Sequence, residues 1–157
     1  QFESFPEILP WMTQRSVRIV HLLRRNLLKR TVSWIIKTKC GRSFSTCALP
    51  QSKIQLQCHT LIPLLEDLET QCERYRQVFS PRFPYLEVFY EDYVAFRERE
   101  TARIGTFLGI GPLGFLESEA VKINSDRLSD IVTNYDEVVE TLSGTPFARF
   151  LDEYAKK

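Results

Sequence analysis

Hydrophobic residues along the chain follow two spacings. Residues 17–23, VRIVHLL, are apolar and rich in β-branched side chains with little polar alternation, which predicts a strand buried on both faces in a parallel sheet. Residues 85–90, YLEVFY, predict a second strand. Elsewhere, apolar residues recur at three- and four-residue steps, which predicts helices from residue 27, over 61–79, from 93 to 108, over 128–142 and from 146. The order strand, helices, strand, helices is typical of an α/β protein.

Proline, glycine and threonine mark the ends of these helices. Pro81 follows the long helix and stops it, because proline lacks the N–H that a continuing helix needs. Gly109 predicts a C-cap after the helix that ends near 108. Thr145 and Pro146 predict the N-cap and the first position of the last helix.

Two strands are fewer than a parallel sheet usually contains. We therefore expect one domain, residues 1–157, whose first strands lie upstream of residue 1. The chain begins with Gln rather than Met, which agrees with that expectation.

Composition supports one globular domain. The chain has 157 residues, of which 43% are hydrophobic and 26% are charged, and these values exclude a disordered tail, a collagen-like chain and a small disulfide scaffold. No stretch is long and apolar enough for a membrane span, and residues 1–11 do not have the pattern of a signal peptide. We expect a cytoplasmic protein, with the Golgi lumen or a larger multidomain enzyme as alternatives. The oligomeric state stays open.

Charge is distributed unevenly, although the net charge is only +1. Residues 8–65 carry +10 and contain no acidic residue, whereas residues 66–157 carry −7. A basic segment of this kind favours an anionic partner. The alternative is a solvated face that forms salt bridges with the acidic second half.

Cysteine, histidine and carboxylate positions favour structural roles. Cys40, Cys47, Cys58 and Cys72 lack the spacing of a zinc site, so we expect no metal. Cys72 is expected in a helix core, and Cys40 and Cys47 could form a bridge only in an oxidising compartment. His21 and His59 are expected to be structural, and the carboxylates at 66, 67, 69, 98 and 100 are expected to be solvated.

Residues 109–114, GIGPLG, match the GxGxxG pattern of dinucleotide sites. They follow a helix rather than a strand and contain a proline, so a helix C-cap and turn explain them better. No GxxxxGK[ST] loop is present in the sequence.

The turn at Arg24-Arg25-Asn26 combines guanidinium groups with the start of a helix, and both bind anions. Ser33 lies eight residues after Arg25, about two helical turns on, so both side chains could reach one phosphate. Ligands of open α/β sheets bind outside the carboxyl ends of strands. Tyr90 ends the second strand at that edge, where its ring could lie against a nucleotide base. The alternative is a core Tyr90 and two surface arginines.

The run HLLRRNLLKRTVSW resembles the 3′-phosphate-binding segment of sulfotransferases that use 3′-phosphoadenosine 5′-phosphosulfate. In that family a strand ends in Arg-Asn-Pro and a serine follows eight residues after the arginine, and Arg25 and Ser33 keep this spacing. Residues 89–92, FYED, and 107–110, FLGI, look like the strand end and helix end of the same family. The tail from residue 121 is similar to the C-terminal segment of bacterial-type sulfotransferase domains, so the resemblance covers most of the chain.

The resemblance implies a three-layer fold with a parallel sheet flanked by helices, related to the P-loop nucleotide kinases. It also implies transfer of a sulfuryl group from the nucleotide donor to a hydroxyl or amine of a small-molecule or glycan acceptor, with no nucleic acid involved. Arg25 and Ser33 would bind the 3′-phosphate, Tyr90 would contact the adenine, and Lys122 with Asn124 and Ser125 would line the nucleotide from the other side.

Two features of the sequence differ from the family. Leu27 replaces the proline, and the Arg-Lys-Gly motif of eukaryotic cytosolic members is not visible, which favours the bacterial type. The 5′-phosphosulfate loop and the usual catalytic base are expected upstream, so the catalytic residues are unknown and this chain alone is expected to be inactive.

Two other functions fit the sequence. A non-enzymatic module could bind nucleic acid or a sulfated glycan through the basic segment 8–65. A relative of nucleotide or sugar kinases would share the fold but use ATP, which an upstream GxxxxGK[ST] loop would support.

Overall fold

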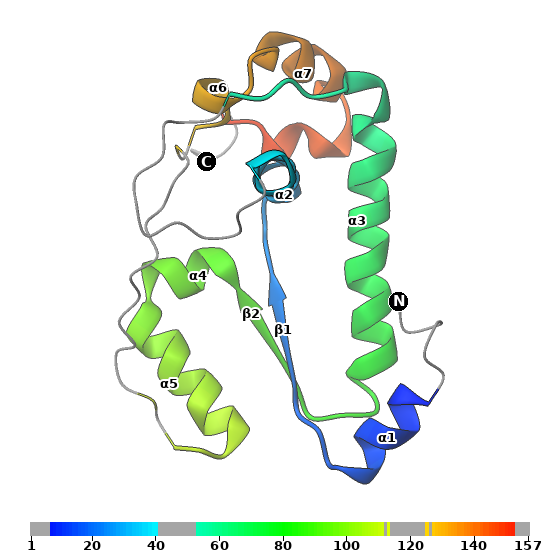
Figure 1. The fold of residues 1–157 in the computed structure, drawn as a ribbon, viewed down its shortest axis with the longest axis vertical. Helices are drawn as coiled ribbons and strands as arrows, with labels where there is room; N and C mark the ends of the chain where they lie inside the picture. The colour runs from blue at the N-terminus through cyan, green and yellow to red at the C-terminus, as the bar shows by residue number, and fades with distance from the viewer. Residues whose placement is uncertain (1–6, 41–52, 112, 114–124, 126, 153–157) are drawn as a thin grey trace. The chain divides into compact units, whose positions relative to one another are not determined.

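A computed structural model describes residues 7–40, 53–111, 113, 125 and 127–152. The chain divides into two compact units. Unit 1 contains the described residues within 1–25 and 70–116, and unit 2 contains those within 26–69 and 117–157. The structure is α/β, as the sequence predicts, and it is mostly helical (Figure 1). No helix in the described part has the length and apolar character of a membrane span. That the two units fold as one domain stays a prediction.

Unit 1 is built around a parallel pair of strands. Strand β1, Ile19–Leu23, pairs with β2, Tyr85–Phe89, from Ile19 opposite Tyr85 to Leu23 opposite Phe89 (Figure 1). Both predicted strands are therefore confirmed. The first begins two residues later than predicted, and Tyr90 belongs to the following helix rather than to β2.

The prediction that β1 is buried on both faces is wrong. Its side chains alternate between the two faces of the strand pair, and Val20 and Leu22 point to the exposed one. The Leu22 side chain is 61% exposed, whereas Val88 on β2 is buried. Among the described residues β1 pairs only with β2, so β1 lacks the cover of an interior strand.

Helix α1, Ile8–Gln14, contributes to a small core in unit 1 that has no predicted counterpart. Met12 packs there with Phe79 and Phe83, which flank the end of the long helix. That helix, α3, spans Cys58–Phe79 and ends before Pro81 as predicted, although it begins three residues earlier.

The helix predicted after β2 is two helices in the structure. Helix α4, Tyr90–Ala95, and helix α5, Arg97–Leu108, are separated at Phe96, whose φ of −132° and ψ of 50° are not helical. Phe96 and Leu108, two apolar residues of the helix predicted from 93 to 108, are exposed. Gly109 caps α5 with φ 78°, in the left-handed region that glycine adopts without a steric penalty, as predicted.

Glu100 was expected to be solvated and is buried. Its carboxylate accepts hydrogen bonds from Arg99, with Nε at 3.1 Å from Oε1, and from Arg103. Arg103 also donates to the carbonyl oxygen of Glu87 in β2, at 2.6 Å. The charge of Glu100 is thus balanced by two guanidinium groups, which permits the burial of a carboxylate.

Unit 2 is helical. Besides the first part of α3 it contains α2, Leu27–Cys40; α6, Leu128–Ile131; α7, Tyr135–Leu142; and the 3₁₀ helix η2, Pro146–Phe150. The helix expected at residue 27 is confirmed. The core of the unit includes Leu28, Val32, Leu61, Leu65, Val138, Leu142, Phe147 and Phe150. The Thr145 side chain accepts a hydrogen bond from the Phe147 N–H at 3.2 Å, which confirms the predicted N-cap.

The helix predicted over 128–142 is interrupted between α6 and α7. Val132 forms a parallel bridge with Ile54, and the Thr133 N–H donates to the Ile54 carbonyl at 2.8 Å. Both Ile54 and Val132 are buried. This pairing with a distant segment replaces the local helical hydrogen bonds.

Cysteine positions differ in part from the prediction. Cys72 is only half-buried, whereas Cys58 is buried, and burial raises the pKa of its thiol. The bridge that Cys40 and Cys47 could form in an oxidising compartment involves Cys47, which lies outside the described residues.

Asn134 links the α6–α7 connection to residue 56. Its Oδ1 accepts from the Leu56 N–H and its Nδ2 donates to the Leu56 carbonyl, both at 2.9 Å. The amide thereby replaces the partners that a neighbouring strand would offer, so the backbone of Leu56 is satisfied by one side chain.

We expect Asn134→Ala to lower the free energy of unfolding by about 1–3 kcal/mol, because both backbone groups of Leu56 lose their partner. Urea denaturation followed by circular dichroism measures this. The control is Glu140→Ala on the exposed side of α7, which should change stability by less than about 0.5 kcal/mol. Equal effects of the two changes would contradict this role of Asn134.

Candidate anion-binding site at the strand ends

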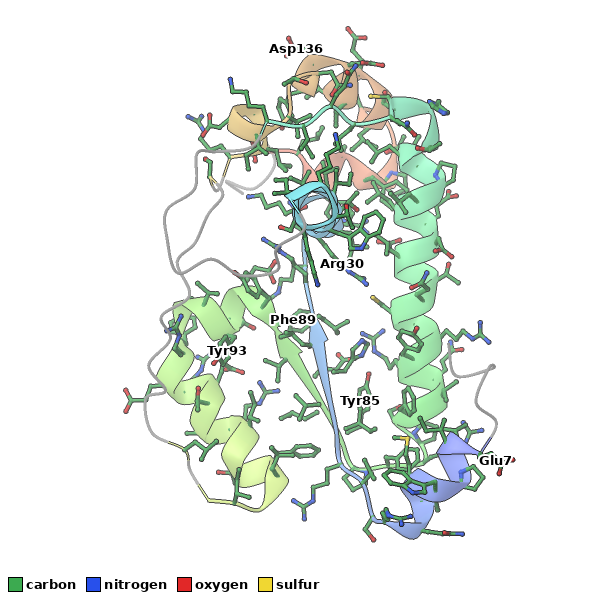
Figure 2. The ribbon with its side chains drawn as sticks, viewed as in Figure 1. Glu7, Arg30, Tyr85, Phe89, Tyr93 and Asp136 are labelled. Carbon is green, nitrogen blue, oxygen red and sulfur yellow. The ribbon has the colours of Figure 1, made fainter. Side chains whose placement is uncertain are left out.

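The carboxyl ends of β1 and β2 lie side by side because the strands are parallel and Leu23 is opposite Phe89. Arg24 and Arg25 therefore follow β1 next to the residues that follow β2, Tyr90 to Asp92. Figure 2 shows Phe89 at this end of the strand pair and Tyr85 at the other. The two sequence motifs thus meet at one edge of unit 1, which we call the strand-end cluster: Arg24, Arg25, Phe89, Tyr90, Glu91 and Asp92.

Arg25 has three contacts in the strand-end cluster. Its Nη1 and Nη2 donate to Oδ1 and Oδ2 of Asp92 at 2.7 and 2.6 Å, a bidentate pair. Its backbone N–H donates to Glu91 Oε2 at 3.1 Å. Its guanidinium lies over the Phe89 ring, 4.3 Å from the centroid. These contacts define the plane and direction of the guanidinium.

Arg24 contacts the next aromatic residue in the same way as Arg25 contacts Phe89. Its guanidinium lies 4.7 Å from the centroid of the Tyr90 ring, and its Nε is 3.7 Å from Glu91 Oε1. Each arginine thus lies over one aromatic ring, and each has an acidic side chain of the segment after β2 nearby.

The charges of the Arg25–Asp92 pair stabilise each other. The hydrogen bond from Arg25 holds the pKa of Asp92 below its ordinary value, and the charges of Arg25, Arg99 and Arg103 act in the same direction. The hydrogen bond to Asp92 likewise raises the pKa of Arg25. Both groups are therefore ionised at neutral pH.

The predicted site residues are distributed as follows. Arg25 and Tyr90 belong to unit 1 and lie in the strand-end cluster, and Tyr90 is exposed with Arg24 over its ring. Ser33 lies on α2 in unit 2 and is half-buried. That Arg25 and Ser33 share a phosphate stays a prediction.

Ser125 is half-buried, and its hydroxyl donates to Asp130 Oδ2 at 2.6 Å and accepts from the Arg127 N–H at 3.1 Å. Lys122 and Asn124 lie outside the described residues. The described residues contain no group of three or more His, Cys, Asp and Glu side chains arranged to hold a metal ion.

Asn26 has a structural role that the sequence motif does not reveal. Its Oδ1 accepts from the Lys29 N–H at 2.9 Å, which caps the start of α2. Its Nδ2 donates to the Phe150 carbonyl at 2.8 Å, which attaches this helix start to η2. The asparagine next to Arg25 therefore positions α2.

Sequence reasoning missed the partners of the arginines. Asp92 was noted only as part of a family motif, and its pairing with Arg25 was not predicted. A signal was present, because opposite charges follow two strands whose parallel pairing places their ends together. The two charged segments predict this pairing only once the register of β1 and β2 is known.

Comparisons of the chain with protein-family models, with curated proteins and with solved structures found no match.

The Arg25–Asp92 pair predicts an acid-sensitive part of the stability. Because the pKa of Asp92 is lower in the folded chain than its ordinary 3.8, the pair stabilises the fold above that pH. This stabilisation is lost as the pH falls further and Asp92 becomes protonated. We expect Asp92→Asn to remove this part of the pH dependence, measured as urea midpoints between about pH 5 and 2.

Arg25→Ala and the double variant provide the control for this prediction. If the hydrogen bond from Arg25 is the main cause, Arg25→Ala loses most of this pH dependence, and the double variant has the profile of Asp92→Asn. A wild-type profile in Arg25→Ala would show that Asp92 acts through another group.

Proposed function

We propose that this chain forms the 3′-phosphate and adenine side of the donor site of a sulfotransferase. The enzyme would move a sulfuryl group from 3′-phosphoadenosine 5′-phosphosulfate to an acceptor hydroxyl or amine. One observation supports this most directly: the segments that resemble the two family motifs meet in the strand-end cluster, through the parallel register of β1 and β2. The cluster lies outside the carboxyl ends of the strands, where nucleotides bind in open α/β folds.

The proposed roles follow from the chemistry of the side chains. Arg25 offers a half-exposed guanidinium, whose planar donors match the oxygens of a phosphate. Ser33 would add a hydroxyl donor to the same phosphate. Tyr90 offers an exposed ring on which an adenine could stack, and Lys122, Asn124 and Ser125 would line the other side of the nucleotide. The complete enzyme would have the three-layer, P-loop-kinase-like fold.

These residues would supply recognition rather than chemistry. In the transfer, the bond between sulfur and the bridging phosphate oxygen breaks while the acceptor oxygen or nitrogen bonds to sulfur. The reaction needs donors that stabilise negative charge on the bridging oxygen and a base that takes the acceptor proton. The 3′-phosphate distinguishes this donor from ATP, so Arg25 and Ser33 would determine which nucleotide binds.

Calorimetric titration with 3′-phosphoadenosine 5′-phosphate tests the proposal, with ADP as the ligand that lacks the 3′-phosphate. We expect the 3′-phosphorylated nucleotide to bind more tightly. Arg25→Ala should weaken its binding by at least about 1.5 kcal/mol, as for the loss of a charge-assisted contact.

Arg15→Ala is the matched control for Arg25→Ala. Arg15 is also an exposed arginine of unit 1, and its guanidinium lies 4.4 Å from the centroid of the Trp11 ring, but it follows α1 rather than a strand. The control should leave the affinity unchanged. Equal affinity for both nucleotides, or equal effects of the two variants, would contradict the proposal.

A second candidate function is an anion-binding module without enzymatic activity, for nucleic acid or a sulfated glycan. The exposed face of α2 favours it. Trp34 is 62% exposed, and Arg30 and Lys37, four residues before and three after it, are exposed on the same side of the helix. An exposed tryptophan beside cations can stack on a base or sugar ring while the cations bind the anionic groups.

This candidate function predicts binding whose affinity depends strongly on salt. It also predicts no preference for a nucleotide with a 3′-phosphate. Affinity for heparin or single-stranded DNA should fall linearly with salt on logarithmic axes, and Trp34→Ala with Lys37→Ala should weaken it. Arg127→Ala, an exposed change outside the basic segment, is the control. Weak binding that none of these changes affects would exclude α2 as the binding surface.

A further inference from the structure

The donors of Arg25 that suit a phosphate already hold a carboxylate. Asp92 accepts from both terminal nitrogens of Arg25, at 2.7 and 2.6 Å, and Glu91 accepts from the Arg25 backbone N–H at 3.1 Å. A carboxylate and a phosphate present the same feature to a guanidinium, two negatively charged oxygens in one plane. Asp92 therefore occupies the position that an anionic ligand would take on these two nitrogens.

This pair lies at the surface and can exchange partners. The Arg25 side chain is 50% exposed and that of Asp92 is 32% exposed, so water can solvate either group when they separate. Exposed ion pairs contribute little to stability, and their separation leaves no buried charge. Arg99 and Arg103 on α5 also act on Asp92 through their charges, so the carboxylate keeps favourable neighbours after it leaves Arg25.

We propose that Asp92 is an intramolecular competitor at an anion-binding site, whose carboxylate covers the Arg25 guanidinium and must be displaced by the phosphate of a ligand. The identification of that ligand as a 3′-phosphorylated nucleotide rests on the proposed function. The displacement itself rests only on the contacts in the strand-end cluster.

Competition from a tethered carboxylate weakens the binding of every anion by the same factor, so only an anion with further contacts still binds at low concentration. Asp92 is part of the same chain, so its effective concentration at Arg25 is far above that of a free anion. A small anion gains only the contact that it takes from Asp92. A nucleotide gains further contacts through its base and sugar, and it can therefore displace the carboxylate at concentrations at which inorganic phosphate or sulfate does not.

Asp92→Asn tests the proposal, because asparagine keeps the size of the side chain but not its charge. Affinity is measured by calorimetry for inorganic phosphate and for 3′-phosphoadenosine 5′-phosphate, at one ionic strength. We expect the variant to bind each ligand about three- to tenfold more tightly than the wild type, which is the gain expected when one exposed ion pair no longer competes. The gain should be the same factor for both ligands, because each must displace the same ion pair.

Glu98→Gln is the matched control. It also removes one negative charge from unit 1, at an exposed position in the first turn of α5, outside the strand-end cluster. It should leave both affinities unchanged, and an equal gain in the control would overturn the proposal. Unchanged or weaker binding by Asp92→Asn would also overturn it, and would make Asp92 a positioning residue that holds Arg25 for its ligand.

The two ligands separate this proposal from the proposed function. If Asp92→Asn binds inorganic phosphate more tightly, but neither the wild type nor the variant binds 3′-phosphoadenosine 5′-phosphate more tightly than ADP, the carboxylate controls an anion site and the sulfotransferase assignment fails. If neither the wild type nor Asp92→Asn binds inorganic phosphate or 3′-phosphoadenosine 5′-phosphate, the displacement proposal fails as well.

A measurement on the wild-type chain does not depend on the variant folding. The pKa of the Asp92 carboxyl, followed by carbon NMR, should rise toward its ordinary value when a ligand displaces it from Arg25. The same low pKa with and without a saturating ligand would show that the pair persists, and would overturn the proposal.

Discussion

The parallel register of β1 and β2 is the constraint on which the candidate site depends. Because Leu23 lies opposite Phe89, the segments that follow the two strands begin at the same level of unit 1. A register shift of one residue would turn every side chain of the shifted strand to the opposite face and would change which side chains meet at the strand ends. The pairing of Arg25 with Asp92, 67 residues apart in sequence, is a direct consequence of this register.

The same contacts explain part of the uneven charge distribution. Arg24, Arg25 and Lys29 all belong to the basic segment 8–65, and each has an acidic partner from the second half of the chain. Glu91 and Asp92 provide the partners in unit 1, and Asp152 provides the one in unit 2. The basic segment predicts either a solvated, salt-bridged face or an anion-binding surface, and the strand-end cluster has features of both. Its arginines have carboxylate partners and are still accessible to solvent.

Local signals predicted the elements that local chemistry determines. The start of α2 at Leu27, the left-handed cap at Gly109 and the Thr145 N-cap each depend on a few neighbouring residues, and all three are confirmed. The predictions that failed depend on distant partners. The interruption between α6 and α7 requires the bridge between Val132 and Ile54. The exposure of one face of β1 depends on which other segments pack against the strand. Helical periodicity contains no information about either partner.

The two kinds of ion pair in unit 1 show which charges a ligand can reach. Glu100 has 4% of its side chain exposed, and separating it from Arg99 and Arg103 would leave a buried carboxylate without compensation. Asp92 and Arg25 are both partly exposed, so water can replace each partner at little cost. Burial therefore makes the Glu100 pairs a permanent part of the packing of α5. Exposure leaves the Arg25–Asp92 pair open to exchange, so an anionic ligand can reach the guanidinium at the strand ends but not the guanidinium groups that hold Glu100.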